Sequence, residues 1–470
     1  MDNSVKHRMA RAAYGQAIDA VLHQVKKDRA KSLLKIVELT ERYFGAQFPK
    51  KVYDQVRRML EDPNDKWVGY VNRLVDEIDP RVIRQTALNL GYEAALNGTK
   101  MIRENRKKYG CNIPWVILMD PTSACNLHCT GCWAAEYGNR LNLSFDELDN
   151  IVTQGKELGV YFYMYTGGEP LVRKDDIIRL CEKHADCAFH AFTNGTLVDE
   201  AFCREMHRVG NLSLSISLEG FEEVNDLRRG TGVFDKVMAA MDLLKKYGQL
   251  YGTSICYTSK NVAAVTSDEF LDLLIEKGCR FTWYFHYMPV GNDAAVELMP
   301  TPEQREYMYH RVREIRGFTG GKPIFAMDFQ NDGEYVGGCI AGGRNYFHIN
   351  SNGDMEPCVF IHYSDSNIRE KTLLEALRSP LFMEYHNHQP FNHNHLRPCP
   401  MLENPQLLPE MVRRAGAHST DLQSPESAEH LCDKCIAYAQ EWCPNAERLW
   451  QTSPAGEKQA QSQPVKAEAV

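Results

Sequence analysis

The chain of 470 residues lacks long apolar runs. None approaches the roughly 18 residues that a membrane-spanning helix needs. The first residues, MDNSVKHRMARAAYG, lack the apolar core of a secretory signal. Positive charge is not in excess either, since the formal net charge is −8, whereas nucleic-acid-binding proteins usually carry a basic patch. We therefore expect a cytoplasmic protein with no transmembrane segment and no nucleic-acid partner.

Cysteine, in contrast, is abundant, with 15 residues. A reducing cytoplasm disfavours disulfides, so clustered cysteines there more often bind metal or take part in chemistry. The first group is Cys125, Cys129 and Cys132. The second group is Cys339, Cys358, Cys399, Cys432, Cys435 and Cys443. The remaining six (Cys111, Cys181, Cys187, Cys203, Cys256 and Cys279) are interpreted as small hydrophobic residues.

The sequence divides into four segments. Residues 1–112 have helical periodicity and contain no convincing strand. Residues 113–335 alternate between strands and helices. Residues 336–450 are irregular and rich in cysteine, and residues 451–470 have almost no large apolar side chains, which favours a disordered tail.

Six strand–helix repeats are expected in the second segment. The predicted strands lie in WVILMD, VYFYMYTGGEP, CAFHAFTNG, LSLSISLEG, LYGTSICYTS and FTWYFHYMPVG. Such alternation indicates an α/β fold with a parallel sheet and right-handed crossovers. Periodicity alone does not distinguish an open doubly wound sheet from a partial barrel.

Unusual residues follow the ends of these strands. The triplet C-x3-C-x2-C comes after the first strand, GGEP ends the second, TNG the third and SLEG the fourth. In parallel strand–helix folds, chemistry gathers at the carboxyl ends of the strands. Three thiolates in a compact loop suit a cubane iron–sulfur cluster with one iron left open for a small molecule. A zinc site is the alternative, although this spacing fits zinc poorly.

The triplet followed by GGEP resembles the radical S-adenosylmethionine (SAM) superfamily over about residues 113–335. The resemblance implies a partial (β/α)6 TIM-like barrel, between an N-terminal helical region and an irregular cysteine-rich C-terminal domain. Many members carry an aromatic residue before the third cysteine, where this chain has Gly131. Trp133 follows that cysteine instead.

The resemblance also implies roles for individual residues. Cys125, Cys129 and Cys132 would ligate a 4Fe–4S cluster whose open iron chelates SAM. The residues expected to contact SAM are Gly167, Gly168, Glu169, Pro170, Asn194, Ser215, Ser217 and Arg229. Taken alone, Asn194, Ser215 and Ser217 are as readily structural, and Arg229 is as readily a surface partner of Asp226.

The second cysteine group begins with a predicted hairpin, YFHIN–turn–MEPCVF. With Cys339 and Cys358, it resembles the first half of the SPASM domain, which binds auxiliary 4Fe–4S clusters. The later cysteines depart from the usual SPASM spacing, so at least one auxiliary cluster is expected without an assigned ligand set. A zinc site formed by Cys399, Cys432, Cys435 and Cys443 is the alternative. The nearby His386, His388, His393 and His395 are expected to form a polar surface loop.

The expected function is reductive cleavage of SAM to a 5′-deoxyadenosyl radical, which abstracts hydrogen from a peptide or protein. A lipid or other small molecule is the alternative substrate, because the N-terminal helices do not resemble a strand-containing peptide clamp. A non-catalytic iron–sulfur electron carrier is the alternative from another class. The expected electron donor is a low-potential protein such as flavodoxin or ferredoxin. His286, Tyr287 and Asp328 are candidate proton or electron partners, and a structural role is the alternative for each of them.

Overall fold

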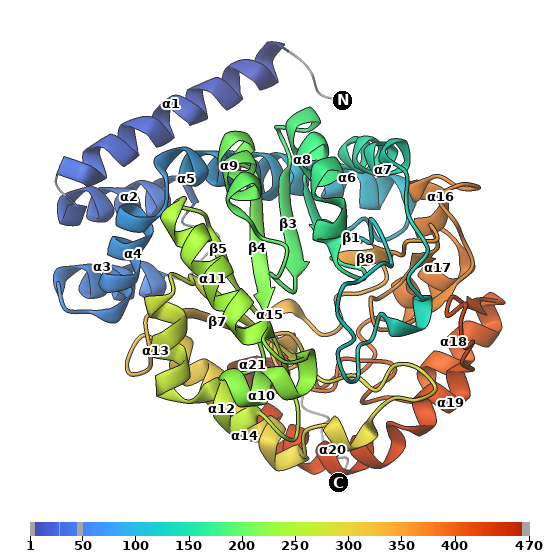
Figure 1. Ribbon diagram of the computed structural model, residues 1–470. Helices are drawn as coiled ribbons and strands as arrows, with labels where there is room; N and C mark the ends of the chain where they lie inside the picture. Colours follow the sequence, from blue (N-terminus) through green and yellow to red (C-terminus); the bar gives the residue numbers. More distant parts are fainter. Residues whose placement is uncertain (1–4, 28, 45–49, 463–470) are drawn as a thin grey trace, which may run out of the picture.

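The computed structural model describes residues 5–27, 29–44 and 50–462. Before residue 116, the described chain forms helices and no strand, as the periodicity predicted (Figure 1). These helices are α1 (Val5–Lys27), α2 (Arg29–Phe44), α3 (Lys50–Glu61), α4 (Lys66–Glu77), α5 (Pro80–Thr86), the π-helix η1 (Ala87–Gly98) and α6 (Thr99–Tyr109). Asp65 and Asp79 cap α4 and α5, because their carboxylates accept hydrogen bonds from backbone N–H groups of the first turn.

The central sheet has nine strands, and the first seven along the chain run parallel to one another. They are β1 (Val116–Met119), β2 (Phe162–Tyr165), β3 (Ala188–Thr193), β4 (Leu212–Ser217), β5 (Tyr251–Tyr257), β6 (Phe281–His286) and β7 (Phe325–Asp328). They lie side by side in chain order. All six predicted strands are present. The seventh was not predicted, because it follows the last of the six strand–helix repeats that the sequence analysis identified.

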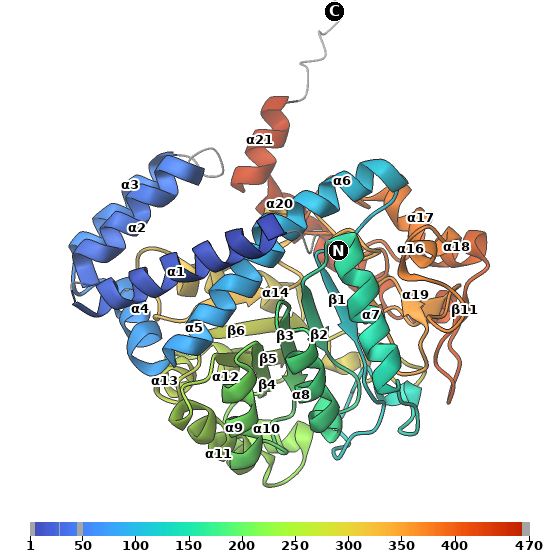
Figure 2. The ribbon, with the colours of Figure 1, turned by 90° about the horizontal axis from the view of Figure 1, so that it is seen from above.

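Helices connect the strands. They are η2 (Ala135–Tyr137), α7 (Phe145–Leu158), η3 (Pro170–Arg173), α8 (Lys174–Lys183), α9 (Glu200–Val209), α10 (Glu222–Arg229), α11 (Val233–Lys246), α12 (Val262–Thr266), α13 (Asp268–Glu276), η4 (Val296–Leu298), α14 (Pro302–Arg316) and α15 (Gly333–Val336). Ser144 and Glu147 form the predicted capping box of α7, and Gly159 ends it. Helices α8, α9 and α11 lie over one face of the sheet (Figures 1 and 2).

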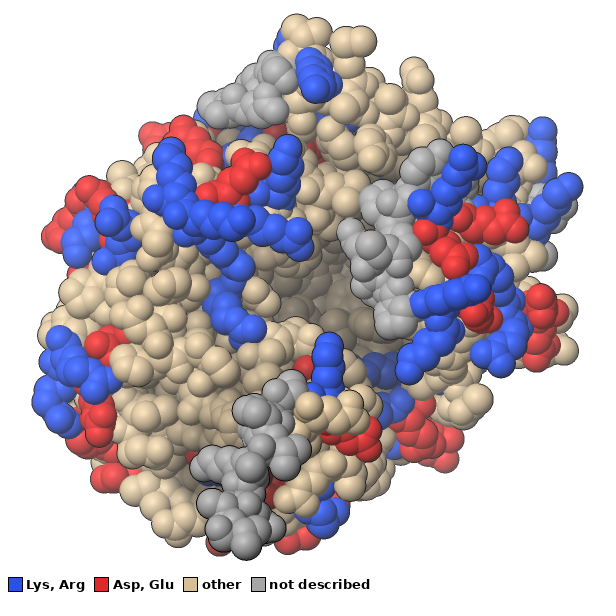
Figure 3. Space-filling model, turned by 180° about the vertical axis from the view of Figure 1, so that it is seen from behind, with Lys and Arg blue, Asp and Glu red and all other residues tan. Residues whose placement is uncertain are grey.

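The sheet stays open. Its two edges are β7 and β9 (Met355–Glu356), a short strand of the C-terminal region, and these two strands do not pair with each other. The fold is therefore a partial barrel, as the family resemblance implied. The face opposite that of Figure 1 is hollowed at its centre, with a floor of uncharged residues and charged residues around it (Figure 3). Within the described part of the chain, no helix has the length and apolar character needed to cross a membrane.

The predicted C-terminal hairpin joins this sheet. Its strands are β8 (Tyr346–Ile349) and β9 (Met355–Glu356), which pair antiparallel. Strand β8 also runs parallel to β1, from the pair Val116–Tyr346 to the pair Met119–Ile349. The cysteine-rich region therefore extends the sheet beside the strand that leads into the first cysteine loop.

A buried histidine holds the hairpin in place. His348 Nε2 lies 2.9 Å from Asp120 Oδ1, and its Nδ1 lies 2.6 Å from Glu356 Oε2. All three side chains are fully buried. Burial alone would lower the pKa of His348, but the two carboxylates raise it to about 10. The imidazolium thus connects the end of β1 to β9.

The rest of the C-terminal region is mostly helical. Its elements are β10 (Tyr363–Ser364), α16 (Leu373–Leu377), α17 (Pro380–His388), α18 (Leu407–Ala415), β11 (His418–Ser419), α19 (Ala428–Asp433), α20 (Ile436–Gln451) and α21 (Pro454–Ser462). Helix α21 lies where the composition favoured a disordered tail. It is anchored because Trp450 Nε1 donates to Gln459 Oε1 and Gly456 N donates to Ser453 Oγ. Residues 463–470 of the predicted tail lie outside the described residues.

We predict that His348→Ala lowers the free energy of unfolding by about 3–5 kcal/mol, because it leaves two buried carboxylates without their cation. The raised pKa makes this contribution fully present below pH 6.5, the ordinary histidine value, and lost as the pH rises through about 10. Urea denaturation at several pH values measures the difference between the variant and the wild type.

His393→Ala is the matched control, since that side chain is 68% exposed. It should leave the unfolding free energy nearly unchanged. A difference for His348→Ala that stays constant between pH 6.5 and pH 10 would contradict a charged imidazole.

Candidate functional site

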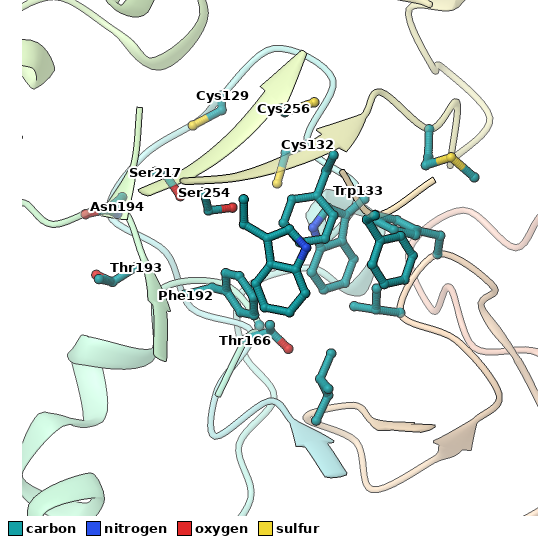
Figure 4. Close-up of a pocket in the computed structure, with 18 of the residues that line it drawn as sticks. Cys129, Cys132, Trp133, Thr166, Phe192, Thr193, Asn194, Ser217, Ser254 and Cys256 are labelled. Carbon is teal, nitrogen blue, oxygen red and sulfur yellow. The ribbon is translucent and has the colours of Figure 1, made fainter. Parts of the chain in front are cut away.

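The first cysteine loop lines a cavity of about 230 Å³ at the carboxyl ends of β2–β6. Cys125, Cys129 and Cys132 all face it, together with the segment Gly167–Glu169. Figure 4 shows Cys129, Cys132 and Cys256 at one end of the cavity, with Asn194 and Ser217 beside them. The parallel topology thus brings together the strand-end residues that the sequence singled out.

Two adjacent arginines secure the loop from the end of α10. Thr130 N donates to the Arg228 carbonyl over 3.0 Å, and Arg228 Nε donates back to the Thr130 carbonyl over 3.2 Å. Arg228 Nη1 also donates to Glu219 Oε1 at 2.6 Å. Sequence reasoning noted Glu219 only as part of SLEG and missed Arg228, for which the RR pair after SLEG was the available signal.

Arg229 is a cavity residue and does not pair with Asp226. Its Nε donates to Glu219 Oε1 over 3.0 Å, and its Nη1 lies 3.9 Å from Cys129 Sγ. Asp226 instead accepts hydrogen bonds from the backbone N–H groups of Gly232 and Phe234. Glu219 Oε2 is buried and has no hydrogen-bond partner among the described residues. Glu219 thus holds both arginines from behind the cavity wall, since Arg228 and Arg229 are lining residues and Glu219 is fully buried outside the lining.

The two glycines of GGEP allow the cysteine loop to pass close by. A Cβ on Gly168 would lie 2.3 Å from the Ala124 carbonyl oxygen, and one on Gly167 would lie 2.5 Å from that of Thr122. Gly168 N and Glu169 N donate to these same two oxygens, Gly168 to that of Thr122 and Glu169 to that of Ala124. Gly167 also has a φ of 109°, which favours glycine. The backbone of Gly167–Glu169 therefore packs directly against the cysteine loop and holds it in place.

Glu169 ties the ends of two strands together. Its carboxylate accepts hydrogen bonds from Leu171 N, Thr193 Oγ1 and Asn194 N at 2.7–2.9 Å. Burial raises the pKa of this carboxyl, and the hydrogen bonds from Thr193 and Asn194 oppose the shift. Pro170 begins η3 directly behind it. Glu169 thus holds the end of β2 against the end of β3.

Asn194 and Ser217 line the cavity, whereas Ser215 lies deeper in the barrel. Asn194 Nδ2 donates to Asn126 Oδ1 at 2.9 Å and lies 4.0 Å from Cys125 Sγ. Ser215 Oγ is fully buried, 2.7 Å from His190 Nε2. Side chains two residues apart on a strand share a face, so Ser215 follows Ser217 inward, away from the rim.

The three residues considered as proton or electron partners differ in position. His286 and Tyr287 line the cavity. His286 Nε2 lies 2.7 Å from the Tyr438 hydroxyl, and burial, with Arg305 nearby, lowers the pKa of His286 well below its ordinary value. Asp328 lies in the core behind the wall, where Asn331 Nδ2 donates to it over 2.9 Å. Burial raises the pKa of Asp328 to about 6, with Asp332 adding to the shift.

Tyr287 takes the space beside Gly131. A Cβ on Gly131 would lie 2.7 Å from the tyrosine ring, and the φ of Gly131 is 66°. The aromatic ring that the family resemblance led us to expect next to the third cysteine is thus supplied from the end of β6. Only Gly leaves room for it there.

The second cysteine group divides between two further cavities. Cys339, Cys358 and Cys399 line one of them. Cys432 and Cys443 line the other, which opens between α18 and α20. Cys435 is fully buried, and its thiol lies 4.0 Å from the Leu431 carbonyl oxygen. All fifteen cysteines are free thiols.

Comparison with known proteins identifies the two regions. Residues 119–274 match the radical SAM superfamily, and residues 339–401 match the SPASM iron–sulfur cluster-binding domain. The chain is a radical SAM enzyme with an SPASM domain. A 4Fe–4S cluster, SAM and auxiliary iron–sulfur clusters are therefore its cofactors.

Curated relatives agree with this family. The AdoMet-dependent heme synthase of Methanosarcina barkeri is 24% identical over 290 residues, which cover 56% of this chain and 82% of that protein. The mycofactocin maturase MftC of Mycobacterium tuberculosis is 28% identical over 295 residues, covering 58% and 74%. Streptococcus suis SuiB bound to S-adenosylmethionine has the same fold, with a TM-score of 0.54 and 18% identity over 72% of this chain and 81% of that one.

Backbone N–H groups face the thiols of this radical SAM enzyme in a repeated way. Leu127 N donates to Cys125 Sγ and Met401 N to Cys399 Sγ, each over 3.4 Å and from two residues further along the chain. Burial raises the pKa of Cys339 to about 11 and of Cys358 to about 12. The N–H groups of Ala341 and Phe360, again two residues on, oppose these shifts.

This donor arrangement fits cluster ligation, because N–H groups stabilise thiolate sulfur and help set the potential of iron–sulfur clusters. It applies to Cys125 in the radical SAM domain and to the three SPASM cysteines that share a cavity. Among the residues that the structure describes, no three His, Cys, Asp or Glu side chains are grouped to hold a single metal ion.

Cys256 is a cavity residue that the sequence analysis treated as a buried hydrophobic one. It lies on β5, and its side chain faces the cavity beside Cys132 (Figure 4). Burial raises its pKa to about 11. The alternation of Ser254 and Cys256 along β5 was the available signal, since residues two apart face the same side.

We predict that Gly168→Ala displaces the cysteine loop, because its Cβ would overlap the carbonyl oxygens of Ser123 and Ala124. The reconstituted variant should lose about four iron atoms per chain, one cluster. Iron analysis and visible absorption measure the loss. Gly91→Ala is the control, since a Cβ there meets nothing within 4 Å. Equal iron contents in both variants would contradict the conclusion that Gly168 holds the cysteine loop in place.

Proposed function

We propose that this radical SAM enzyme cleaves SAM reductively and abstracts hydrogen from a substrate bound in the same cavity. Cys125, Cys129 and Cys132 would hold the 4Fe–4S cluster. The observation that carries the proposal is that these three thiols line one cavity with the GGEP segment. When bound, the reduced cluster supplies the electron that breaks a carbon–sulfur bond of SAM.

The chain's own residues would bind SAM through complementary charges. The Arg229 guanidinium suits the SAM carboxylate, since such pairs can be bidentate. The segment Gly167–Glu169, which lines the cavity, would hydrogen-bond the SAM ammonium through its backbone. Asn194 and Ser217 would contact the ribose from the rim. Glu169 and Ser215, whose polar atoms are engaged within the protein, would position the site.

A reductant and a substrate are both required by a radical SAM enzyme. A flavodoxin or ferredoxin in the cytoplasm would supply the electron. The four segments predicted from the sequence would divide the work, with residues 113–335 cleaving SAM and residues 336–450 holding the auxiliary cluster.

Replacing Cys125, Cys129 and Cys132 together by Ala should abolish formation of 5′-deoxyadenosine from SAM under dithionite, with iron retained at the SPASM cysteines. Chromatography of the anaerobic reaction and iron analysis measure both results. Cys181→Ala, at a fully buried position on α8, is the control and should keep activity. Undiminished 5′-deoxyadenosine from the triple variant would refute the assignment and favour an electron carrier.

The proposed substrate is a peptide that inserts an aromatic or apolar side chain. The aromatic residues lining the cavity are Trp133, Phe192, Trp283, Phe285, Phe329, Tyr346 and Phe360, with Tyr287 at the rim. The rings of Trp283 and Phe285 are stacked 5.3 Å apart. Arg228 and Arg229, the arginines on the described wall, both pair with Glu219.

An uncharged ring therefore fits this cavity better than a group with several carboxylates, which would need free cations. The maturase among the relatives supports a peptide. Because a heme synthase is also among the relatives, binding of a porphyrin is included as an alternative outcome of the test.

Trp133 and Trp283 allow binding to be followed by tryptophan fluorescence. N-acetyl-tyrosinamide should bind at least about tenfold more tightly than N-acetyl-aspartamide, a difference of about 1.4 kcal/mol. Phe285→Ala should remove most of this preference, because aromatic pairs contribute about 0.5–1.5 kcal/mol beyond burial. Phe221→Ala, at an exposed position, is the control. Tight binding of an iron porphyrin or a lipid, without preference for the tyrosine probe, would overturn the peptide proposal.

A further inference from the structure

The substrate cavity and the SPASM cavity share a wall. Met288, Phe329, Ile340, Tyr346 and Phe360 line both of them. The wall exists because β8 pairs with β1, which places Tyr346 opposite Val116 in the barrel sheet. A side chain in this wall faces the first cysteine loop on one side and Cys339, Cys358 and Cys399 on the other.

Tyr346 alone in the shared wall combines a ring with a polar group. Its hydroxyl oxygen lies 2.8 Å from Cys358 Sγ, and the residue is 3% exposed. The ring meets Phe329 edge-on, with centroids 6.1 Å apart. Packing therefore fixes the ring, and the ring fixes the direction of the hydroxyl.

The direction of this hydrogen bond follows from the chemistry of the sulfur. A cysteine that ligates iron is a thiolate and has no proton to donate. The Tyr346 hydroxyl must then be the donor and the sulfur the acceptor. Hydrogen bonds to cluster sulfurs withdraw negative charge and raise the reduction potential.

Backbone N–H groups also face these thiols, but the peptide framework fixes them. Tyr346 differs, because its donor stands on a side chain whose other end forms the wall of the substrate cavity.

We infer that Tyr346 sets the reduction potential of the auxiliary cluster from the wall of the substrate cavity, by donating a hydrogen bond to the Cys358 thiolate. This rests on the proposed function, in which Cys358 is a ligand of that cluster. Tyr346 is a positioning residue, since it acts on the cluster through the sulfur of Cys358.

Tyr346→Phe removes the hydroxyl and keeps the ring. The matched control is Tyr385→Phe, because Tyr385 is fully buried beside the same cysteines and its hydroxyl has no hydrogen-bond partner among the described residues. Both are made in the full chain that also carries Ala at positions 125, 129 and 132, so that only the auxiliary cluster contributes.

The reduction potential is measured by a redox titration monitored by electron paramagnetic resonance. Tyr346→Phe should shift the potential to a more negative value, with the iron content unchanged. Tyr385→Phe should leave the potential at that of the parent chain. Equal potentials in the parent and both variants, or the same shift in both, would overturn the inference.

Cys358→Ala in the same background distinguishes the ligand role of Cys358 from the effect of Tyr346 on the reduction potential. Loss of the auxiliary cluster from this variant supports Cys358 as a ligand. In that case an unshifted potential in Tyr346→Phe overturns the role of Tyr346 and leaves the proposed function intact. Retention of the full cluster defeats the ligand assignment, and with it the part of the proposed function on which the inference rests.

Discussion

The contact between the imidazole of His348 and the carboxylates of Asp120 and Glu356 supports the rest of this structure. It joins the end of β1, from which the first cysteine loop departs, to the SPASM hairpin. Tyr137, in the segment after that loop, donates a hydrogen bond to Glu356 as well. Trp133 packs edge-on against the His348 ring, with centroids 5.9 Å apart. One buried cation therefore fixes three segments that are distant in sequence.

This constraint has a chemical consequence. Because β8 is held beside β1, the two cysteine groups open onto neighbouring cavities with a common aromatic wall. The first cavity has the Arg229 guanidinium beside the cysteine loop and aromatic rings along its wall. The second has thiols with backbone donors. The two cysteine groups and the aromatic wall between them thus belong to one continuous core.

Much of the site could be predicted from the sequence, because motifs that follow parallel strands must meet at one rim. This reasoning correctly identified six strands, the hairpin and the convergence of Cys125, Gly168, Asn194 and Arg229. It missed β7, which follows the last of the six predicted strand–helix repeats. The family resemblance led us to expect that Ser215 contacts SAM, whereas the pleat directs this side chain inward. Sequence reasoning also overlooked Cys256 on the inner face of β5. It also favoured disorder where the indole of Trp450 anchors α21.

The sequence by itself determined the family, the alternation of strands and helices and the cysteines able to hold iron, because each of these is encoded in local spacing. Tertiary structure alone decided which polar atoms remain free. Glu169 and Glu219 are both acidic residues after a strand, yet the carboxylate of the first is satisfied by three neighbours and one oxygen of the second is not. It also decided that Tyr346 and Cys358, separated by a hairpin, meet in the wall between two cavities. Such pairings depend on how strands from different regions pack, and no local period in the chain specifies them.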